Sequence, residues 1–432
     1  MRRRPPSRPR PALGMSAALR PKARLLGPTL VLAMALPTSV LYSVGAVGAQ
    51  LTAALGVSRS ALGALPTAVF GTAAMLSLWS GGLVDRIGAR AALLTLFSVA
   101  TTAFVLMGLA SGYAGLLAAM ILSGVGQAMS NPATNLAITE NVEPAARAGA
   151  VGRKQAGVQL SALVVGLAAP LLSGLAGWRA VLLAGAPLAL FALVMTASTL
   201  PARPLGPAVR RAPGWRPARP NRYLALLMAF LAALGCGVSA VATFTTLYGQ
   251  ERLHQPPGTS ALLIAALGVA GVASRLIWSR HAAALPLLSP LLRRLAAGAA
   301  VSAVLIWAGA ELGPAALWIG TVGVGATAVG ANAVTMVLIV RDRRSGPLGP
   351  SSALLSLGFF TGFVLGPIPL GAIADTLGYG PAWLAVAGLF LLAAGLAGLV
   401  LRHESAPRVA PPERGGSLGP EVTAAGRSGS PR

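Results

Sequence analysis

Residues 81–90 read Gly81-Gly-Leu-Val-Asp85-Arg-Ile-Gly-Ala-Arg90 and form a short charged segment between two long apolar runs. The runs on either side, residues 60–80 and 91–110, contain no charged residue. A helix of about 20 apolar residues is long enough to cross the hydrocarbon core of a bilayer. The pattern therefore predicts a tight loop that joins two transmembrane helices at one face of a membrane.

The composition of the whole chain also indicates a membrane protein. Of its 432 residues, 55% are hydrophobic and 10% are charged, whereas a typical soluble domain has roughly 25% charged residues. The net charge of +24 would suggest a nucleic-acid partner in a soluble protein, but here the basic residues lie between apolar runs and at the chain ends. We therefore expect a lipid bilayer around the chain and no nucleic-acid binding.

Twelve apolar runs follow one another along the sequence and predict an all-α membrane protein of two six-helix bundles, residues 25–200 and 223–401. Residues 201–222 are rich in Arg and Pro and form the linker. The polar ends, residues 1–24 and 402–432, are expected to be disordered tails. The predicted spans are about residues 25–51, 60–80, 91–110, 113–139, 148–175, 178–200, 223–248, 259–278, 294–311, 314–340, 347–373 and 380–401.

The distribution of basic residues predicts the orientation. If both ends of the chain are cytoplasmic, all but three of the 34 Lys and Arg residues fall on the cytoplasmic side. The exceptions are Arg59, Arg179 and Arg252. Because cytoplasmic loops carry the excess of basic residues, we expect a multi-pass membrane protein with both termini inside. The high content of Ala, Arg and Gly is typical of a GC-rich bacterial genome, so we expect the bacterial cytoplasmic membrane.

The two halves of the sequence repeat each other weakly. Gly124-Val-Gly126 in the fourth span matches Gly323-Val-Gly325 in the tenth, and Pro170-x-x-x-Gly174 in the fifth matches Pro367-x-x-x-Gly371 in the eleventh. Such internal repeats are typical of secondary transporters, which bind substrate between the repeats near the middle of the membrane.

The pattern Gly82-x-x-Asp85-Arg86-x-Gly88-x-Arg90 resembles the signature of the loop between the second and third helices of the major facilitator superfamily. This resemblance implies twelve helices and transport by rocking of two six-helix halves around a central site. In that family the loop latches the cytoplasmic side while the protein opens outward. The resemblance implies this inner-latch role for Gly82, Asp85, Arg86, Gly88, Arg90 and, at the matching position after the eighth span, Arg275. The alternative is that the charges only set orientation and end the helices.

The two glycines of this segment have separate predicted roles. Gly82 is expected to allow two helices to approach closely, and Gly88 to adopt the positive φ angle that a tight turn needs. Glycine and proline in spans five and eleven resemble the packing motif of antiporters in the same family, although the match in span five is poorer. The residues concerned are Gly166, Pro170, Gly174, Gly362, Gly366, Pro367 and Gly371.

Polar side chains inside the spans are the candidates for the substrate cavity. Gln127, Asn131 and Asn135 recur every four residues and therefore share one face of the fourth span. Amides in hydrocarbon need polar partners, so this face should meet protein or a cavity. The remaining candidates are Thr38, Tyr42, Lys154, Gln155, Gln159, Thr243, Thr327 and Asn332. The alternative for all of them is hydrogen bonding that only packs the bundle.

Lys154 follows Arg153 at the start of the fifth span, and two behaviours are open to this pair. If the helix turns them inward, they attract an anion, as basic residues in transporter cavities do. If it turns them outward, they extend to the lipid headgroups, which is the favoured interpretation.

The source of energy is left open by the sequence. No Asp or Glu lies in the middle of a span, and Glu311 at the end of the ninth is the nearest candidate proton carrier. Proton-linked drug exporters of the family usually have an arginine where this chain has Met120. No catalytic set, phosphate-binding loop or metal site is present in the sequence, so we expect neither an enzyme nor a cofactor.

The leading functional hypothesis is a monomeric secondary transporter that exports a small organic or drug-like compound, by resemblance with protons as the coupling ion. The competing hypothesis is uptake of a small organic or inorganic anion, which Arg153, Lys154 and Met120 favour. A non-transporting membrane sensor is a remote third.

Overall fold

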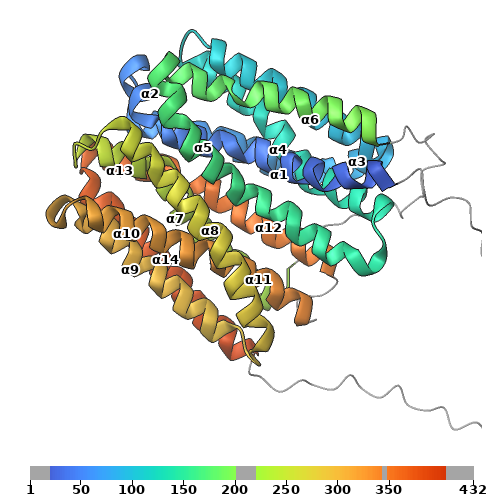
Figure 1. Cartoon of the computed structure of the whole chain (residues 1–432). Helices are drawn as coiled ribbons and strands as arrows, with labels where there is room; N and C mark the ends of the chain where they lie inside the picture. Colours follow the sequence, from blue (N-terminus) through green and yellow to red (C-terminus); the bar gives the residue numbers. More distant parts are fainter. Residues whose placement is uncertain (1–19, 201–219, 343–347, 405–432) are drawn as a thin grey trace, which may run out of the picture.

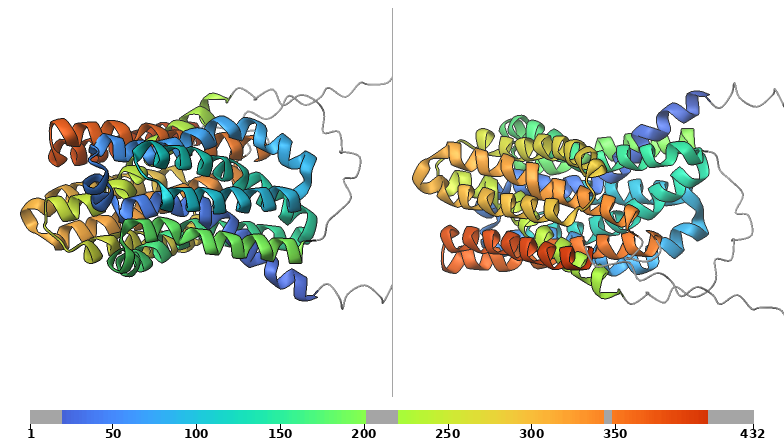
Figure 2. Two further views of the ribbon diagram at one scale, coloured as in Figure 1. Left: turned by 90° about the horizontal axis from the view of Figure 1, so that it is seen from above. Right: turned by 90° about the horizontal axis from the view of Figure 1, so that it is seen from below.

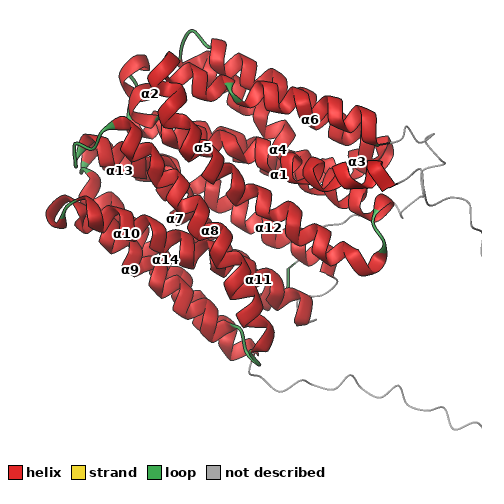
Figure 3. Cartoon of the chain, in the orientation of Figure 1, coloured by secondary structure: helices red, strands yellow, loops and turns green. Residues whose placement is uncertain are grey.

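The computed structural model of the chain describes residues 20–200, 220–342 and 348–404. Most of the predicted tails and of the linker lies outside these ranges. Within them every regular element is helical (Figure 3), because in lipid only helices or closed barrels satisfy all backbone groups. The elements are α1 (Arg20–Ala46), α2 (Gly48–Leu55), α3 (Arg59–Leu109), α4 (Tyr113–Asn141), η1 (Pro144–Ala146), α5 (Arg147–Leu183), α6 (Gly185–Thr199), α7 (Arg222–Glu251), α8 (Pro257–Ala284), α9 (Ser289–Leu312), α10 (Pro314–Val324), η2 (Gly325–Val329), α11 (Gly330–Arg341), α12 (Leu348–Leu365), α13 (Pro367–Thr376) and α14 (Tyr379–Glu404).

Eleven of the described helical stretches are long and apolar enough to cross a membrane, and Gly185–Thr199 is a shorter apolar helix. The short helix completes a twelfth crossing. α5 contains a reversal at Ala176 and Gly177, where φ of Gly177 is 72°, so residues 178–183 already belong to the sixth span. The predicted twelve-helix fold is confirmed.

The helices form two bundles, α1–α6 and α7–α14 (Figure 1). α1 begins, α6 ends, α7 begins and α14 ends at the same end of the molecule, as the views in Figure 2 also show. We call this end the inner end, which the sequence predicts to be cytoplasmic, and the opposite end the outer end.

Close helix packing joins the two bundles in their outer parts. A Cβ atom on Gly63 of α3 would lie 2.5 Å from the carbonyl oxygen of Pro367, and one on Gly371 of α13 would lie 2.6 Å from that of Arg59. α5 and α8 cross in the same way, with Gly166 against Ala265. Because small residues let backbones touch in lipid, these contacts seal the outer end.

Toward the inner end the two bundles diverge (Figure 1). α4 of the first bundle and α11 of the second are not among the described helix pairs that pack together. The two bundles therefore pack closely in their outer parts and diverge toward the inner end, the arrangement that one state of an alternating-access cycle requires.

The charged segment at residues 81–90 differs from the predicted loop. Helix α3 continues through most of it, and the chain turns only at Gly88, where φ is 81°. The prediction of a positive φ at Gly88 is confirmed. The predicted close approach at Gly82 is wrong for this conformation, because a Cβ atom there would have no neighbour within 4 Å.

Two spans are interrupted where one continuous helix was predicted. The tenth contains the π-helical turn η2 between α10 and α11. Ser274 and Trp278 of α8 donate hydrogen bonds of 2.9 and 2.8 Å to the carbonyl oxygens of Gly325 and Ala326 in this turn. The eleventh divides into α12 and α13 at Pro367, which has no backbone N–H to continue the helix.

Candidate functional site

Lys154 is the most unusual polar residue of the bundle interior. Its side chain is only 1% exposed, and its ammonium lies 2.7 Å from the hydroxyl of Thr134, 2.7 Å from Oδ1 of Asn135 and 3.3 Å from Oδ1 of Asn131. All three partners are neutral. No carboxylate among the described residues pairs with it.

The packing of α5 explains why Lys154 points inward. Less than one turn later, Gly157 brings α5 so close to α1 that a Cβ atom would lie 2.5 Å from the carbonyl oxygen of Val31. Lys154 consequently enters the space between α1, α4 and α5, while the preceding Arg153 is exposed. The favoured expectation that Lys154 extends to the lipid headgroups is wrong. Its side chain is long enough to do so, but it lies on the face of α5 that packs against α1 and α4.

The predicted stripe on α4 supplies the surroundings of Lys154. Asn131 also accepts a hydrogen bond of 3.4 Å from Gln155 of α5. One turn deeper, Thr38 of α1 donates to Gln127 at 3.4 Å. Asn135 is exposed, so the cluster reaches water on the side where the bundles diverge. These predicted cavity residues therefore lie together.

A second cation, on the other bundle, lies near Gln159, one turn of α5 beyond Gln155. Arg275 of α8 lies within electrostatic range of the buried phenol of Tyr42, which lies beside Gln159. Nε of Arg275 and Oε1 of Gln159 are buried without a hydrogen-bond partner. Gln159 packs directly on Gly271, one turn from Arg275 along α8. Both halves thus bring one cation and unpaired polar atoms toward the centre.

Three further predicted cavity residues are placed differently. Thr243 is fully buried and donates to the carbonyl oxygen of Ser239 in its own helix. Thr327 donates to Gly323 and turns its methyl group toward Gly298 of α9, away from the first bundle. Asn332 is 7% exposed on α11. For the two threonines the packing alternative describes the geometry better.

Two arginines of the predicted inner latch have contacts outside the charged segment. Arg90 donates a 3.1 Å hydrogen bond to the carbonyl oxygen of Ala197 at the end of α6. Arg275 lies more than two turns inside α8 and beside Tyr42, not at the helix end. The latch role of Asp85, Arg86 and Arg90 therefore remains a prediction for a state that is closed at the inner end.

Glycines of the predicted packing motif lie mostly at tight helix contacts. Gly362 and Gly366 pack on α7, and Gly371 packs on Arg59. Gly166 packs across the interface on α8, whereas a Cβ atom on Gly174 would meet nothing within 4 Å. All three glycines of the motif in the eleventh span therefore lie at tight helix contacts, whereas only one of the two in the fifth span does.

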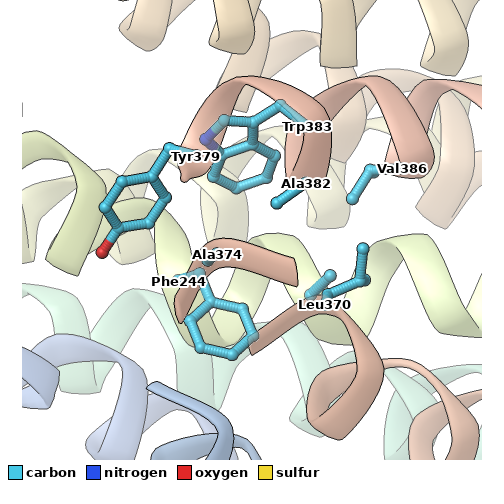
Figure 4. A pocket seen from close by; sticks show the side chains of 8 residues that line it. Phe244, Leu370, Ala374, Tyr379, Ala382, Trp383 and Val386 are labelled. Atoms are coloured by element: carbon cyan, nitrogen blue, oxygen red, sulfur yellow. The ribbon is translucent and has the colours of Figure 1, made fainter. Parts of the chain in front are cut away.

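Two cavities lie outside the polar cluster. One of about 140 Å³ lies between α1, α3, α5 and α6 and is lined almost entirely by apolar residues such as Leu160, Val164 and Phe104. The other, of about 10 Å³, lies in the second bundle near the outer end, and Figure 4 shows the rings of Tyr379, Trp383 and Phe244 around it. Neither contains a residue predicted to bind substrate.

Sequence reasoning missed one site altogether. At the outer end Arg59 binds Glu251 at 2.6 Å and Asp375 at 3.5 Å, and the hydroxyl of Tyr379 donates to Glu251 at 2.8 Å. Asp375 also accepts from the backbone N–H groups of Arg59 and Ser60, which caps the start of α3. The sequence identifies Arg59 only as one of three basic residues on the predicted outer side. The acidic residues predicted on the same side, Glu251 and Asp375, were the sequence signal that could have indicated an ion pair with Arg59.

Comparison with known proteins places this arrangement in a family. The chain matches the family model of the Major Facilitator Superfamily over residues 29–349. Its fold is similar to the crystal structure of a mutant of the nucleoside transporter NupG, with a TM-score of 0.70 and 14% identity over 88% of this chain and 99% of that one.

A bacterial homolog of the human lysosomal transporter Spinster, in an inward-facing and occupied conformation, gives a TM-score of 0.68 and 17% identity over 90% of this chain and 98% of that one. Its unoccupied form gives a TM-score of 0.68 and 18% identity over 89% and 98%. These low identities support the fold alone. Because the family model covers most of the sequence, the chain belongs to the Major Facilitator Superfamily.

Proposed function

We propose that this protein is a secondary active transporter for a small organic anion, and that Lys154 binds the anionic group. The observation that carries the proposal is the buried ammonium with three neutral partners. Burying a charge is costly unless it is paired, and amide or hydroxyl oxygens offset only part of that cost. An anionic substrate would supply the missing charge.

The position of Lys154 suits a transported ligand. Its partner Asn135 is exposed where the bundles diverge, so a solute could reach the ammonium from the inner end. Arg275 of the second bundle lies beside Tyr42 of α1.

The chain also supports proposals about its setting. We propose that both termini are cytoplasmic, which the distribution of basic residues supports, and that the membrane is a bacterial cytoplasmic membrane, which the high content of Ala, Arg and Gly supports. We propose that it works as a monomer, since each chain has both halves that the cycle needs.

A second candidate function is export of a drug-like compound in exchange for protons. The tight glycine contacts of Gly362, Gly366 and Gly371 favour it, because they resemble the packing motif of antiporters in this family. In that case the substrate would not need a negative charge, and Lys154 would contribute little to its affinity.

Thermal stabilisation of the purified protein separates the two candidates. The panel comprises acetate, lactate, succinate, benzoate and phosphate as anions, benzamide and uridine as uncharged probes, and ethidium as a drug-like cation. At about a hundred times its Kd a ligand should stabilise the protein by about 2.7 kcal/mol. Stabilisation by an anion that Lys154→Gln removes supports the proposal.

The matched control is Arg153→Gln, which removes the neighbouring but exposed charge and should leave stabilisation unchanged. Stabilisation by ethidium alone, equal in Lys154→Gln and the parent, would overturn the anion proposal in favour of drug export. Uptake measured in inside-out and right-side-out vesicles then gives the direction.

A further inference from the structure

Lys154 is a lysine, whereas almost every other basic residue of the chain is an arginine. Only two of the 34 basic residues are lysines, Lys22 and Lys154. An arginine remains charged at any physiological pH, whereas a lysine can lose its proton when it is buried. Position 154, in the interior beside α4, therefore has a basic side chain whose charge can change, although nearly all other basic residues are arginines.

The surroundings of Lys154 accommodate both forms of its amino group. As an ammonium it donates three hydrogen bonds, to Asn131, Thr134 and Asn135. The hydroxyl of Thr134 then donates to the carbonyl oxygen of Ser130 at 2.5 Å. As an amine, Lys154 donates to the two asparagines and accepts the Thr134 hydroxyl proton across the same 2.7 Å. Neither form leaves a buried polar group without a partner.

We propose that Lys154 carries one proton together with the anion, so that anion and proton cross the membrane in the same direction. This inference rests on the proposed function and adds the coupling ion. When the anion binds, the lone pair of Nζ takes a proton from a hydronium ion at the open side, so that an O–H bond breaks, an N–H bond forms and a water molecule is left. After the anion leaves on the other side, that bond breaks and the proton returns to water.

Other ionisable groups on the elements packed against α5 do not offer the same chemistry. Arg275 on α8 is a guanidinium and stays charged, and Tyr42 on α1 is an acid rather than a base. The remaining groups with described side chains on those elements and on α5 itself lie toward helix ends, beside the Gly88 turn of α3 or, for Arg153, on the exposed face of α5. They are Arg59, Asp85, Arg86, Arg90, Tyr113, Glu140, Arg147, Arg153, Arg179 and His281, with Arg280 beside the last.

The proposal has a defined electrical consequence. A monovalent anion and one proton carry no net charge across the membrane, so transport should not respond to membrane potential. An inward proton gradient would then drive uptake. Exchange of a substrate for protons, as in the drug-export candidate, would instead require the substrate to displace the proton.

The scarcity of lysine allows a direct test. The full-length protein, labelled with ¹⁵Nζ and ¹³Cε lysine, should show two lysine side-chain signals, and Lys22→Arg identifies the one from Lys154. Without ligand we expect a Lys154 amine signal at a pH where Lys22 is still an ammonium. Adding the stabilising anion at that pH should convert Lys154 to the ammonium. The inference would be overturned if, without ligand, Lys154 showed an ammonium signal at every pH at which Lys22 shows one.

Proteoliposomes containing a pH-sensitive dye test the coupling itself. In the parent, an inward gradient of the anion should acidify the lumen. Lys154→Arg keeps the positive charge but cannot release a proton, so it should still be stabilised by the anion and should produce no acidification. Acidification by Lys154→Arg equal to that of the parent contradicts proton carriage by Lys154. Failure of every anion to stabilise the parent contradicts the proposed function instead, so the two failures are distinct.

Discussion

The molecule holds its two most important cations in opposite ways. Arg59 at the outer end has two carboxylates and a tyrosine hydroxyl as partners, and its side chain is 31% exposed. Lys154 is 1% exposed and has only neutral partners. A cation with its own counter-ions fastens one bundle to the other. A basic group without them is left available for an anion from outside the protein, with the proton that accompanies it.

The largest effect should come from giving Lys154 a counter-ion of its own. In Asn135→Asp a carboxylate replaces the amide that lies 2.7 Å from the ammonium. We expect anion affinity to fall by about a hundredfold, or about 3 kcal/mol, because the anion must displace an internal partner. The ligand-free protein should become more stable. Calorimetric titration with the stabilising anion measures both changes.

Asn135→Ala is the matched control for this substitution, since it removes the acceptor without adding a charge. It should weaken anion binding only a few-fold. Equal losses of affinity in the two variants would show that the carboxylate does not act as a counter-ion, and the contrast with Arg59 would lose its basis.

An intermediate effect is expected at the seal of the outer end. In Gly371→Leu the added side chain cannot fit against the backbone of Arg59, where a Cβ atom alone would lie at 2.6 Å. Overpacking of this kind costs about 1–3 kcal/mol, and here it should act against the state closed at the outer end. Labelling of a cysteine placed in the outer part of α7, in a Cys236→Ser background, should become faster.

Gly82→Leu provides the comparison, because nothing lies within 4 Å of a Cβ atom at that position. It should leave outer labelling unchanged. Faster labelling in both variants would indicate general loosening of the bundle rather than opening at the outer end.

The smallest effect concerns the outer ion pair. Arg59→Gln, Glu251→Gln and the double variant form a double-mutant cycle across the bundle interface. Because both side chains are about a third exposed, we expect a coupling energy of at most about 1 kcal/mol. Denaturation midpoints in detergent measure it. A coupling energy of several kcal/mol would instead show that the Arg59–Glu251 pair is shielded from water, as Lys154 is.

The fold followed from the sequence because hydropathy and the positions of basic residues determine membrane topology with little tertiary information. The stripe on α4 was predictable for the same reason, since Gln127, Asn131 and Asn135 repeat with the helix period. The direction of Lys154 was not, because it depends on the contact of Gly157 with α1. The pairing of Arg59 with Asp375 joins residues that are 316 positions apart, and no local pattern encodes such a contact.

The π-helical turn η2 also breaks the symmetry of the duplicated chain. One extra residue in a turn rotates everything that follows by about 100° relative to a regular helix. Gly323 and Gly325 precede or begin this turn, so the matching glycines of α4 remain in register. The segment after it, α11, presents a different face. The two spans are therefore unlike: α4 contributes the two asparagines around Lys154, whereas α11 contains the single amide Asn332.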